Sequence, residues 1–389
     1  MGIGTLFTAP VEGISTRGAG VLHVQGYCIF MDYTVPGDRI IGQISEEHKD
    51  WAKGELLEIL EPSPQRRTPV CDVFGTCGAC SLQHLSYETQ ISEKARIVQD
   101  ALSRIGGLTS PLPLTCVASQ PWAYRNRVQF HSIRPFHPGA LGFKSRDHTR
   151  IIPLRDCPVA DPGIRQALRE RALLPPPGQD RFTVYSRLNT FLSEGALRRG
   201  RVSLLDRELL IDAGVFFQSN GNMLELLIKD LKEHALEADR SLPMADLYCG
   251  VGTFGAFLQD LFPRMDLVEQ NPGALALARE NVRGKGIGYA ALGTDQWVKT
   301  RSPKGPYGFM VVDPPRQGLS PGLRQWLVQR GPRLLAYVSC DPATLARDSK
   351  ALVQGGYELK ALKLYDFYPQ TAHIESLGFF TKDRAVHDT

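Results

Sequence analysis

A strand, a glycine turn and the start of a helix follow one another at residues 244–255, and this motif constrains the fold more than any other feature of the chain. Its sequence, MADLYCGVGTFG, is an apolar strand-like stretch followed by glycines at positions 250, 252 and 255. Glycines let the backbone approach a ligand closely and aim helix N–H groups at it. From residue 211 onward, strand and helix patterns alternate, as in a doubly wound α/β sheet. We therefore expect a nucleoside-binding, Rossmann-like domain over residues 211–389.

Two acidic residues, each at the end of a later strand-like stretch, help to distinguish between two classes of nucleotide-binding enzyme. Glu269 ends the stretch that follows the glycine turn, where a carboxylate can bind ribose hydroxyls. Together with GVGTFG it also fits the dinucleotide fingerprint, with an offset of about 20 residues, so an NAD-dependent oxidoreductase is one alternative. The stretch FMVVDPPR then ends in an acid at Asp313 followed by two prolines. Many nucleic-acid methyltransferases place such an acidic proline loop beside the methyl donor and target base, whereas dehydrogenases have no use for it.

Cys340 ends the apolar stretch LAYVSC and is a candidate nucleophile. Open α/β sheets bind their ligands at the carboxyl ends of strands, so a thiol there can meet a substrate. Glu375 follows in YPQTAHIE and is a candidate proton acceptor. Most cysteines are small buried hydrophobes, which is the alternative for Cys340 taken by itself. The glycine turn and the acidic loop favour the catalytic interpretation.

The order of these motifs resembles that of the S-adenosylmethionine-dependent RNA 5-methyluridine methyltransferases. The resemblance extends upstream to FFQSN at 216–220 and YRNR at 124–127. It implies that Cys340 is the nucleophile and Glu375 the base. The residues that it implies for donor binding are Gln218, Tyr248, Glu269 and Asp313.

Two positions near the donor are less well matched. Thr253 stands where some members have an asparagine, and Asp295 is a weaker candidate for the adenine end.

The chemistry of uracil explains these residue types. Uracil C5 is a poor nucleophile, and a thiolate that adds at C6 produces an enolate able to take a methyl group. A carboxylate must then remove the C5 proton before the cysteine leaves. The base must also be extruded from its stack, at a cost of a few kcal/mol. RNA 5-methylcytosine enzymes have a cysteine at the position of Arg316, and adenine-amino enzymes often an aromatic residue, so Arg316 favours uridine.

Four cysteines predict a second site. Cys71, Cys77 and Cys80 have the spacing C-x5-C-x2-C, and Cys157 follows later. Four thiolates can hold zinc or a [4Fe–4S] cluster, and the spacing alone does not separate them; unligated thiols are a third possibility. The four residues are similar to the iron–sulfur ligands in the rRNA-modifying branch of the family. The resemblance implies a [4Fe–4S] cluster, and large-subunit rRNA rather than tRNA as the substrate, because tRNA-modifying relatives generally lack these cysteines.

Two further domains are expected before the catalytic one. Glycine-rich turns between short apolar stretches predict a small all-β barrel over residues 1–61, which resembles the OB-like, RNA-binding TRAM domain. Residues 62–210 predict a mixed α+β domain that holds the cysteine site. Within it, residues 87–105 have apolar positions at helical spacing. In related enzymes part of the region near 82–107 docks on the catalytic domain.

Charge and composition limit the partners. The formal charge is only +4 over 389 residues, so RNA binding is expected from local patches. The candidates are Arg66-Arg67, Tyr124 with Arg125 and Arg127, and Arg198-Arg199-Arg201, and a solvated face is the alternative for each. No secretory signature and no apolar run of about 18 residues is present. We expect a cytoplasmic, monomeric enzyme without a membrane partner; a non-catalytic RNA-binding or assembly factor of the same fold is a further alternative.

Overall fold

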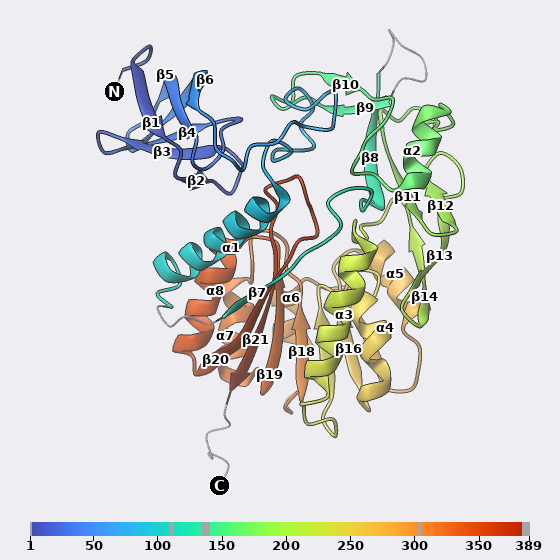
Figure 1. Cartoon of the computed structure of the whole chain (residues 1–389). Helices are drawn as coiled ribbons and strands as arrows, with labels where there is room; N and C mark the ends of the chain where they lie inside the picture. Colours follow the sequence, from blue (N-terminus) through green and yellow to red (C-terminus); the bar gives the residue numbers. More distant parts are fainter. Residues whose placement is uncertain (1, 109–112, 134–140, 302–304, 383–389) are drawn as a thin grey trace.

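The computed structural model describes residues 2–108, 113–133, 141–301 and 305–382. Within these ranges the strands form sheets of six, five, two and eight strands. Figure 1 shows the six-stranded sheet at the amino-terminal end, the five-stranded sheet beside it, and the eight-stranded sheet with its helices below both.

The amino-terminal segment folds as one sheet with strand order β1-β5-β6-β4-β3-β2. Its strands are β1 (Leu6–Pro10), β2 (Gly13–Ile14), β3 (Gly20–Val24), β4 (Tyr27–Met31), β5 (Arg39–Glu47) and β6 (Trp51–Glu61). In β1, exposed and buried residues alternate, which is the period of a strand with one solvated face. Phe7, Leu22, Ile29 and Met31 fill the core of this unit. The expected all-β composition is confirmed; a TRAM-type barrel stays a prediction.

The middle of the chain builds the five-stranded sheet, in the order β10-β9-β8-β11-β12, and the hairpin β13-β14. The elements are β8 (Arg127–Ser132), β9 (Leu141–Lys144), β10 (Ile151–Pro153), α2 (Pro162–Arg169), β11 (Arg181–Arg187), β12 (Thr190–Ser193), β13 (Arg199–Leu204) and β14 (Arg207–Asp212). The core of this middle region contains Phe130, Phe182 and Val159. The same cluster includes Cys77 and Cys157. Two of the predicted cluster ligands are therefore core residues here.

The helix expected over residues 87–105 is confirmed as α1 (Tyr87–Arg104). It begins where the Ser86 hydroxyl accepts a hydrogen bond from the Thr89 amide at 3.3 Å, an N-cap. Val98 and Leu102 of α1 belong to the same core as Leu345 and Ala346 of α8. Figure 1 shows α1 between the amino-terminal sheet and α8. The helix thus docks on the catalytic domain.

The eight-stranded sheet has the order β17-β16-β15-β18-β19-β21-β20-β7. Its strands are β7 (Leu114–Val117), β15 (Met244–Leu247), β16 (Met265–Val268), β17 (Ile287–Ala290), β18 (Phe309–Val312), β19 (Leu334–Ser339), β20 (Tyr357–Tyr365) and β21 (Glu375–Lys382). The first five strands of the order are parallel, as predicted for a doubly wound sheet. Antiparallel β21 between β19 and β20 was not predicted. The connection at 366–374 contains no helix, so β21 returns beside β20 without the crossover that a parallel strand requires.

Helices cover both faces of this sheet. They are α3 (Gly221–Ala235), α4 (Thr253–Leu258), η1 (Gln259–Leu261), α5 (Pro272–Asn281), α6 (Thr294–Thr300), α7 (Pro321–Arg330) and α8 (Pro342–Gln354). Phe309 and Val311 of β18 pack with α3, α4 and α5, whereas Met310 and Val312 pack with α1, α6, α7 and α8. This alternation explains why the strand is apolar throughout. Across the described ranges, every helix is too short or too polar to cross a membrane.

Candidate active site

The carboxyl ends of four neighbouring parallel strands meet at one edge of the sheet. In the register, Val268 pairs with Leu247, Leu247 with Val312, and Val312 with Tyr337 near the end of β19. The predicted site residues that follow these strands are Glu269, Tyr248, Asp313 and Cys340. The fold therefore brings four of the six predicted catalytic and donor residues to one edge, where open α/β sheets bind their ligands.

Cys340 and Glu375 become neighbours through the antiparallel pair β19-β21. The last residue pair of that register is Ser339 with Ser376. Cys340 follows Ser339 and Glu375 precedes Ser376, so these two residues lie beside each other. Burial and the negative charges of Glu375 and Asp313 raise the pKa of the Cys340 thiol to about 12, and Arg316 opposes this shift. Burial and Asp313 also hold the pKa of Glu375 well above its usual range. The thiol and the acid share one buried space, as a nucleophile and its later base must.

Arg316 is the cation of this space, and sequence reasoning had used it only to exclude other bases. Its charge lowers the pKa of both Cys340 and Glu375, against the effect of burial. Its Nη2 lies 3.1 Å from Nδ1 of His373. Burial, followed by the charge of Glu375, raises the pKa of Tyr368 to about 12, which places this phenol beside the base. Tyr368 and His373 were quoted within a motif without a role, because their proximity depends on how loop 366–374 folds.

The glycine turn leaves room for a ligand. Glu269 accepts hydrogen bonds from the amides of Gly250 at 3.1 Å and Asn271 at 2.7 Å, so its carboxylate stands against the turn. Gly250 and Gly252 have left-handed φ values of 54° and 80°, which favour glycine. A Cβ on Gly250 would meet no described atom within 4 Å. The backbone at Gly250 is thus open on the side where a Cβ would stand.

Two other donor candidates surround this space. The buried Gln218 Oε1 has no hydrogen-bond partner among the described residues. A buried acceptor without a partner is costly and suggests a donor group from a ligand. Tyr248 has a left-handed φ of 64°, and its hydroxyl shares a 2.9 Å hydrogen bond with Thr294 Oγ1. The weaker candidate Asp295 is exposed and accepts a 2.5 Å hydrogen bond from Ser320 Oγ, so its carboxylate already supports the start of α7.

Asp246 is a residue of the motif to which the sequence had assigned no role. Its side chain is fully buried; Oδ2 accepts a 3.0 Å hydrogen bond from the Gly255 amide, and Oδ1 has no partner within the described part of the chain. Burial, with the charges of Asp313 and Glu269, raises its pKa to about 8. A lone acid inside an apolar strand before a glycine turn is the signal that could have indicated it.

The four predicted cluster ligands line one cavity. Cys71, Cys77, Cys80 and Cys157 surround it together with apolar residues. Burial raises the pKa of all four thiols, to about 12 for Cys80 and about 11 for Cys157. Over the described residues, no three histidine, cysteine or acidic side chains are grouped as a metal site. The four thiols thus line one cavity, but the described residues do not arrange them as a metal site, and a bound metal group stays a prediction.

Backbone hydrogen bonds connect the cysteine cavity to the active-site region. The Arg125 amide donates to Val159 O at 2.8 Å, two residues after Cys157. The next residue, Asn126, donates from its amide to Ser219 O at 2.6 Å and accepts from the Gly221 amide at 2.8 Å. The segment at 124–127 is therefore bonded on one side to a residue of the cavity wall and on the other to the segment at 216–221.

The predicted RNA patches differ in how much of their charge is free. Arg66 forms an ion pair with buried Asp38. Arg198 and Arg199 both lie against Asp212, at 2.6 and 2.8 Å. The patch at 124–127 differs, because the Arg127 guanidinium stands 5.7 Å from the ring centroid of Phe216, which is 61% exposed. A cation beside an exposed ring is a surface on which an unstacked base can stack, and an RNA contact at this patch stays a prediction.

Comparison with known proteins gives the family. Residues 306–383 match the family model described as tRNA (Uracil-5-)-methyltransferase, and residues 207–336 match the methyltransferase small domain. An uncharacterized RNA methyltransferase of Treponema denticola is 34% identical over 388 aligned residues, covering 92% of this chain and 94% of the relative. A 23S rRNA (uracil(1939)-C(5))-methyltransferase of Edwardsiella ictaluri is 30% identical and covers 93% of both chains. The chain belongs to the RNA (uracil-C5) methyltransferase family.

A solved structure gives the fold of this methyltransferase family. The Pyrococcus abyssi tRNA (uracil-54, C5)-methyltransferase in complex with S-adenosyl-L-homocysteine has a TM-score of 0.74 and 22% identity, covering 96% of this chain and all of that chain. The Rossmann-like methyltransferase fold is therefore confirmed. Neither the nicotinamide oxidoreductase nor the non-catalytic factor is favoured by these similarities. The chain is an RNA methyltransferase that uses S-adenosylmethionine.

The buried carboxyl of Asp246 predicts a pH-dependent stability. It keeps its proton up to about pH 8 in the folded chain but releases it near pH 4 when unfolded. The stability that this proton contributes is complete below pH 4 and is lost, by up to about 1.4 kcal/mol per pH unit, as pH rises toward 8. Asp246→Asn should remove this slope. Melting temperatures of both proteins without donor, from pH 5 to 8, should diverge in favour of the variant; parallel curves would contradict the assignment.

Proposed function

We propose that this enzyme transfers a methyl group from S-adenosylmethionine to C5 of a uridine in large-subunit rRNA, with Cys340 as nucleophile and Glu375 as base. The observation that carries the proposal is the pairing of β19 with β21, which sets the thiol and the carboxyl side by side. Relatives such as the 23S rRNA enzyme of Edwardsiella ictaluri favour rRNA as the substrate. A tRNA uridine is the alternative that the Pyrococcus abyssi structural neighbour suggests.

Each step uses a residue of the site. The Cys340 thiolate adds to uracil C6, and the electron pair of the C5–C6 double bond moves into an enolate. C5 of the enolate then takes the methyl group from the donor sulfonium, which becomes a neutral thioether. Glu375 accepts the C5 proton, the C5–C6 double bond forms again, and the sulfur–C6 bond breaks to release Cys340.

The electrostatics of the empty site suit this order. The raised pKa values keep Cys340 and Glu375 protonated until positive charge enters. Arg316 already opposes these shifts, and the sulfonium of a bound donor would add the further positive charge that favours the ionised forms. Once the methyl group has moved, the sulfonium charge is gone and Glu375 regains its high proton affinity. The carboxylate becomes a stronger base at the step that needs one.

The donor is proposed to lie over the glycine turn. Glu269, fixed by two backbone amides, would accept hydrogen bonds from the ribose. Gln218 would use its unpaired Oε1 toward the donor, and Tyr248 and Asp313 would border the donor from the ends of β15 and β18.

We further propose that Cys71, Cys77, Cys80 and Cys157 hold a [4Fe–4S] cluster. Their shared cavity supports this, because burial raises the pKa of the four thiols and the charge of Arg125 only partly opposes it, so a bound cation would be needed to stabilise four thiolates. The cluster would stabilise the central domain and, through Val159 and Arg125, the segment beside the active site. Zinc and unligated thiols are the alternatives. A reduced, cytoplasmic environment suits free thiols and a cluster alike.

Removing the nucleophile tests the reaction. Cys340→Ala should lower methylation of uridine RNA by more than about 10³-fold, since no other group can form the adduct. Folding and RNA binding should persist, because a half-exposed thiol contributes little packing. RNA containing 5-fluorouridine should trap the wild-type protein covalently, because fluorine cannot leave as a proton does. Substantial turnover by Cys340→Ala would refute the assignment.

Glu375 is proposed to act after methyl transfer, so its substitution should give a different result from that of Cys340. Glu375→Gln should slow proton removal by about 10²–10⁴-fold and accumulate a methylated protein–RNA adduct on ordinary uridine substrate. Denaturing gels with methyl-labelled donor should reveal a labelled band of higher mass, which Cys340→Ala cannot form. If Glu375 only supports the loop, the variant will lose stability or RNA affinity and give no such band.

The cluster proposal has a spectroscopic test. Protein purified without oxygen from iron-replete cells should be brown and absorb in the visible range. Substituting Cys80 or Cys157 with serine should bleach it and loosen the central domain more than the catalytic sheet, as measured by hydrogen exchange. A colourless, zinc-loaded protein under the same conditions would count against iron and sulfur.

A further inference from the structure

Loop 366–374, which joins β20 to the base at the start of β21, is unusually buried for a loop. Asp366 and Phe367 are each 1% exposed, Gln370 is 3% exposed, and Glu375 after the loop is 4% exposed. Loops normally lie at the surface because their backbone groups need partners. This loop must therefore be held by specific contacts, and the position of Glu375 depends on them.

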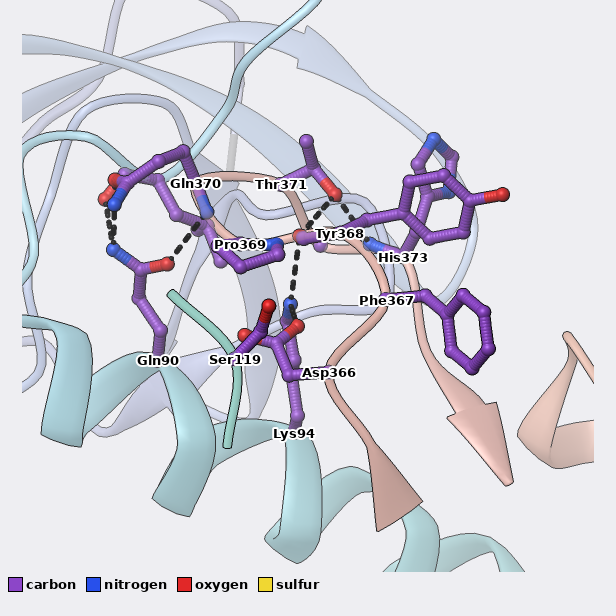
Figure 2. A network of polar contacts seen from close by, with 12 residues as sticks. Gln90, Lys94, Ser119, Asp366, Phe367, Tyr368, Pro369, Gln370, Thr371 and His373 are labelled. Carbon is purple, nitrogen blue, oxygen red and sulfur yellow. Dashed lines mark hydrogen bonds and ion pairs between the residues drawn. The ribbon is translucent and has the colours of Figure 1, made fainter. Parts of the chain in front are cut away.

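Helix α1 supplies two of these contacts from one face. Gln90 and Lys94 lie four residues apart, so both side chains point the same way. Lys94 Nζ lies 2.7 Å from Asp366 Oδ1 and donates to Tyr368 O at 3.1 Å. Gln90 donates to Gln370 Oε1 at 3.0 Å and accepts from the Gln370 amide at 2.8 Å. Figure 2 shows both side chains rising from α1 to the loop, Lys94 to Asp366 and Tyr368 and Gln90 to Gln370.

The conformation of the loop explains why it needs this support. Gln370 has a left-handed φ of 67°, which a residue other than glycine keeps only when its surroundings hold it there. Thr371 Oγ1 donates to Tyr368 O at 2.8 Å, so the turn closes on the same carbonyl that Lys94 contacts. The loop carries Tyr368 toward Glu375.

The Lys94–Asp366 pair is not needed to dock α1. Both charged side chains are 0% exposed, and a buried ion pair is often no more stabilising than well-packed apolar residues. The second half of α1 already packs its apolar face against α8, through Val98 and Leu102. Two polar residues of α1, Gln90 and Lys94, instead contact the loop that ends in the proposed base.

We propose that Lys94 and Gln90 are positioning residues that hold loop 366–374 so that Glu375 can take the C5 proton. The inference rests on the proposed function. In the step they serve, the C5–H bond breaks, the proton goes to the Glu375 carboxylate, its electron pair forms the C5–C6 double bond, and Cys340 leaves C6 with the sulfur–carbon electrons. Addition of the thiol and methyl transfer do not use Glu375 and should depend little on α1.

The test separates positioning from stability with a double variant. Lys94→Met combined with Asp366→Leu removes both charges together, so that no buried ion stays unpaired. Trapping by 5-fluorouridine RNA should stay within about twofold of wild type, while resolution of the methylated adduct on uridine RNA should slow by about 10²-fold, the loss expected from a displacement near 1 Å. Val98→Ala is the matched control, because it loosens the apolar packing of α1 and leaves the hydrogen bonds and the ion pair of Gln90 and Lys94 with the loop in place.

The outcomes are distinct. Slow resolution in the double variant with normal resolution in Val98→Ala supports positioning. Normal resolution in the double variant, or equally slow resolution in Val98→Ala at a similar melting temperature, overturns it. If the double variant does not fold, Gln90→Met carries the same test, since it removes the amide contacts to Gln370 without creating a buried charge. Failure of wild-type protein to be trapped at all would refute the proposed function instead.

Discussion

The antiparallel pairing of β21 with β19 is the constraint on which the active site depends. A parallel strand in that place would end at this edge, and its first residue would lie at the opposite edge of the sheet. Because β21 runs the other way, it begins here, and its first residue, Glu375, stands beside the residue that ends β19, Cys340. The reversal brings the proposed nucleophile and the proposed base together from segments that are separate in sequence.

Burial determines the chemical character of this site. The partly buried thiol of Cys340 lies near buried carboxyl groups, with Arg316 as a cation that acts on both Cys340 and Glu375. Low polarity favours the neutral forms of these groups, so the Cys340 thiol needs added positive charge nearby to become a thiolate. Reactivity therefore depends on the charge of bound substrates, which limits side reactions of the thiol when the donor is absent.

Parts of the chain far apart in sequence meet at loop 366–374. The Tyr124 hydroxyl donates to Pro369 O at 2.8 Å from the central part of the chain. Ser81 donates its amide to Gln370 O at 3.0 Å, and Ser81 Oγ accepts from the Ala372 amide at 3.0 Å. The amino-terminal sheet is tied to the same helix, because the Ile14 amide donates to the Glu93 carboxylate at 2.8 Å. Loop 366–374 is thus hydrogen-bonded to the central part of the chain and to α1, and α1 in turn to the amino-terminal sheet.

The sequence by itself determined the chemistry and the parallel part of the sheet. Several predicted strands end in a glycine, an acidic residue or a thiol. Because the carboxyl ends of parallel strands share one edge of the sheet, these end residues could be predicted as site residues. The helix at 87–105 followed from its spacing alone. Cys340 and Glu375 could be named from their motifs, and the family from the order of those motifs.

Only the tertiary structure decided what surrounds these residues. The direction of β21, the buried pair of Lys94 with Asp366, the burial of Asp246 and the cavity shared by the four cysteines are long-range contacts. Local periodicity carries no information about such contacts, since each depends on where distant segments pack. The arginine patches make the same point, because Arg66 and Arg198 look free in sequence and are held by acids in the fold. Residue type decides which chemistry is possible, and packing decides which charges are paired and which stay available for it.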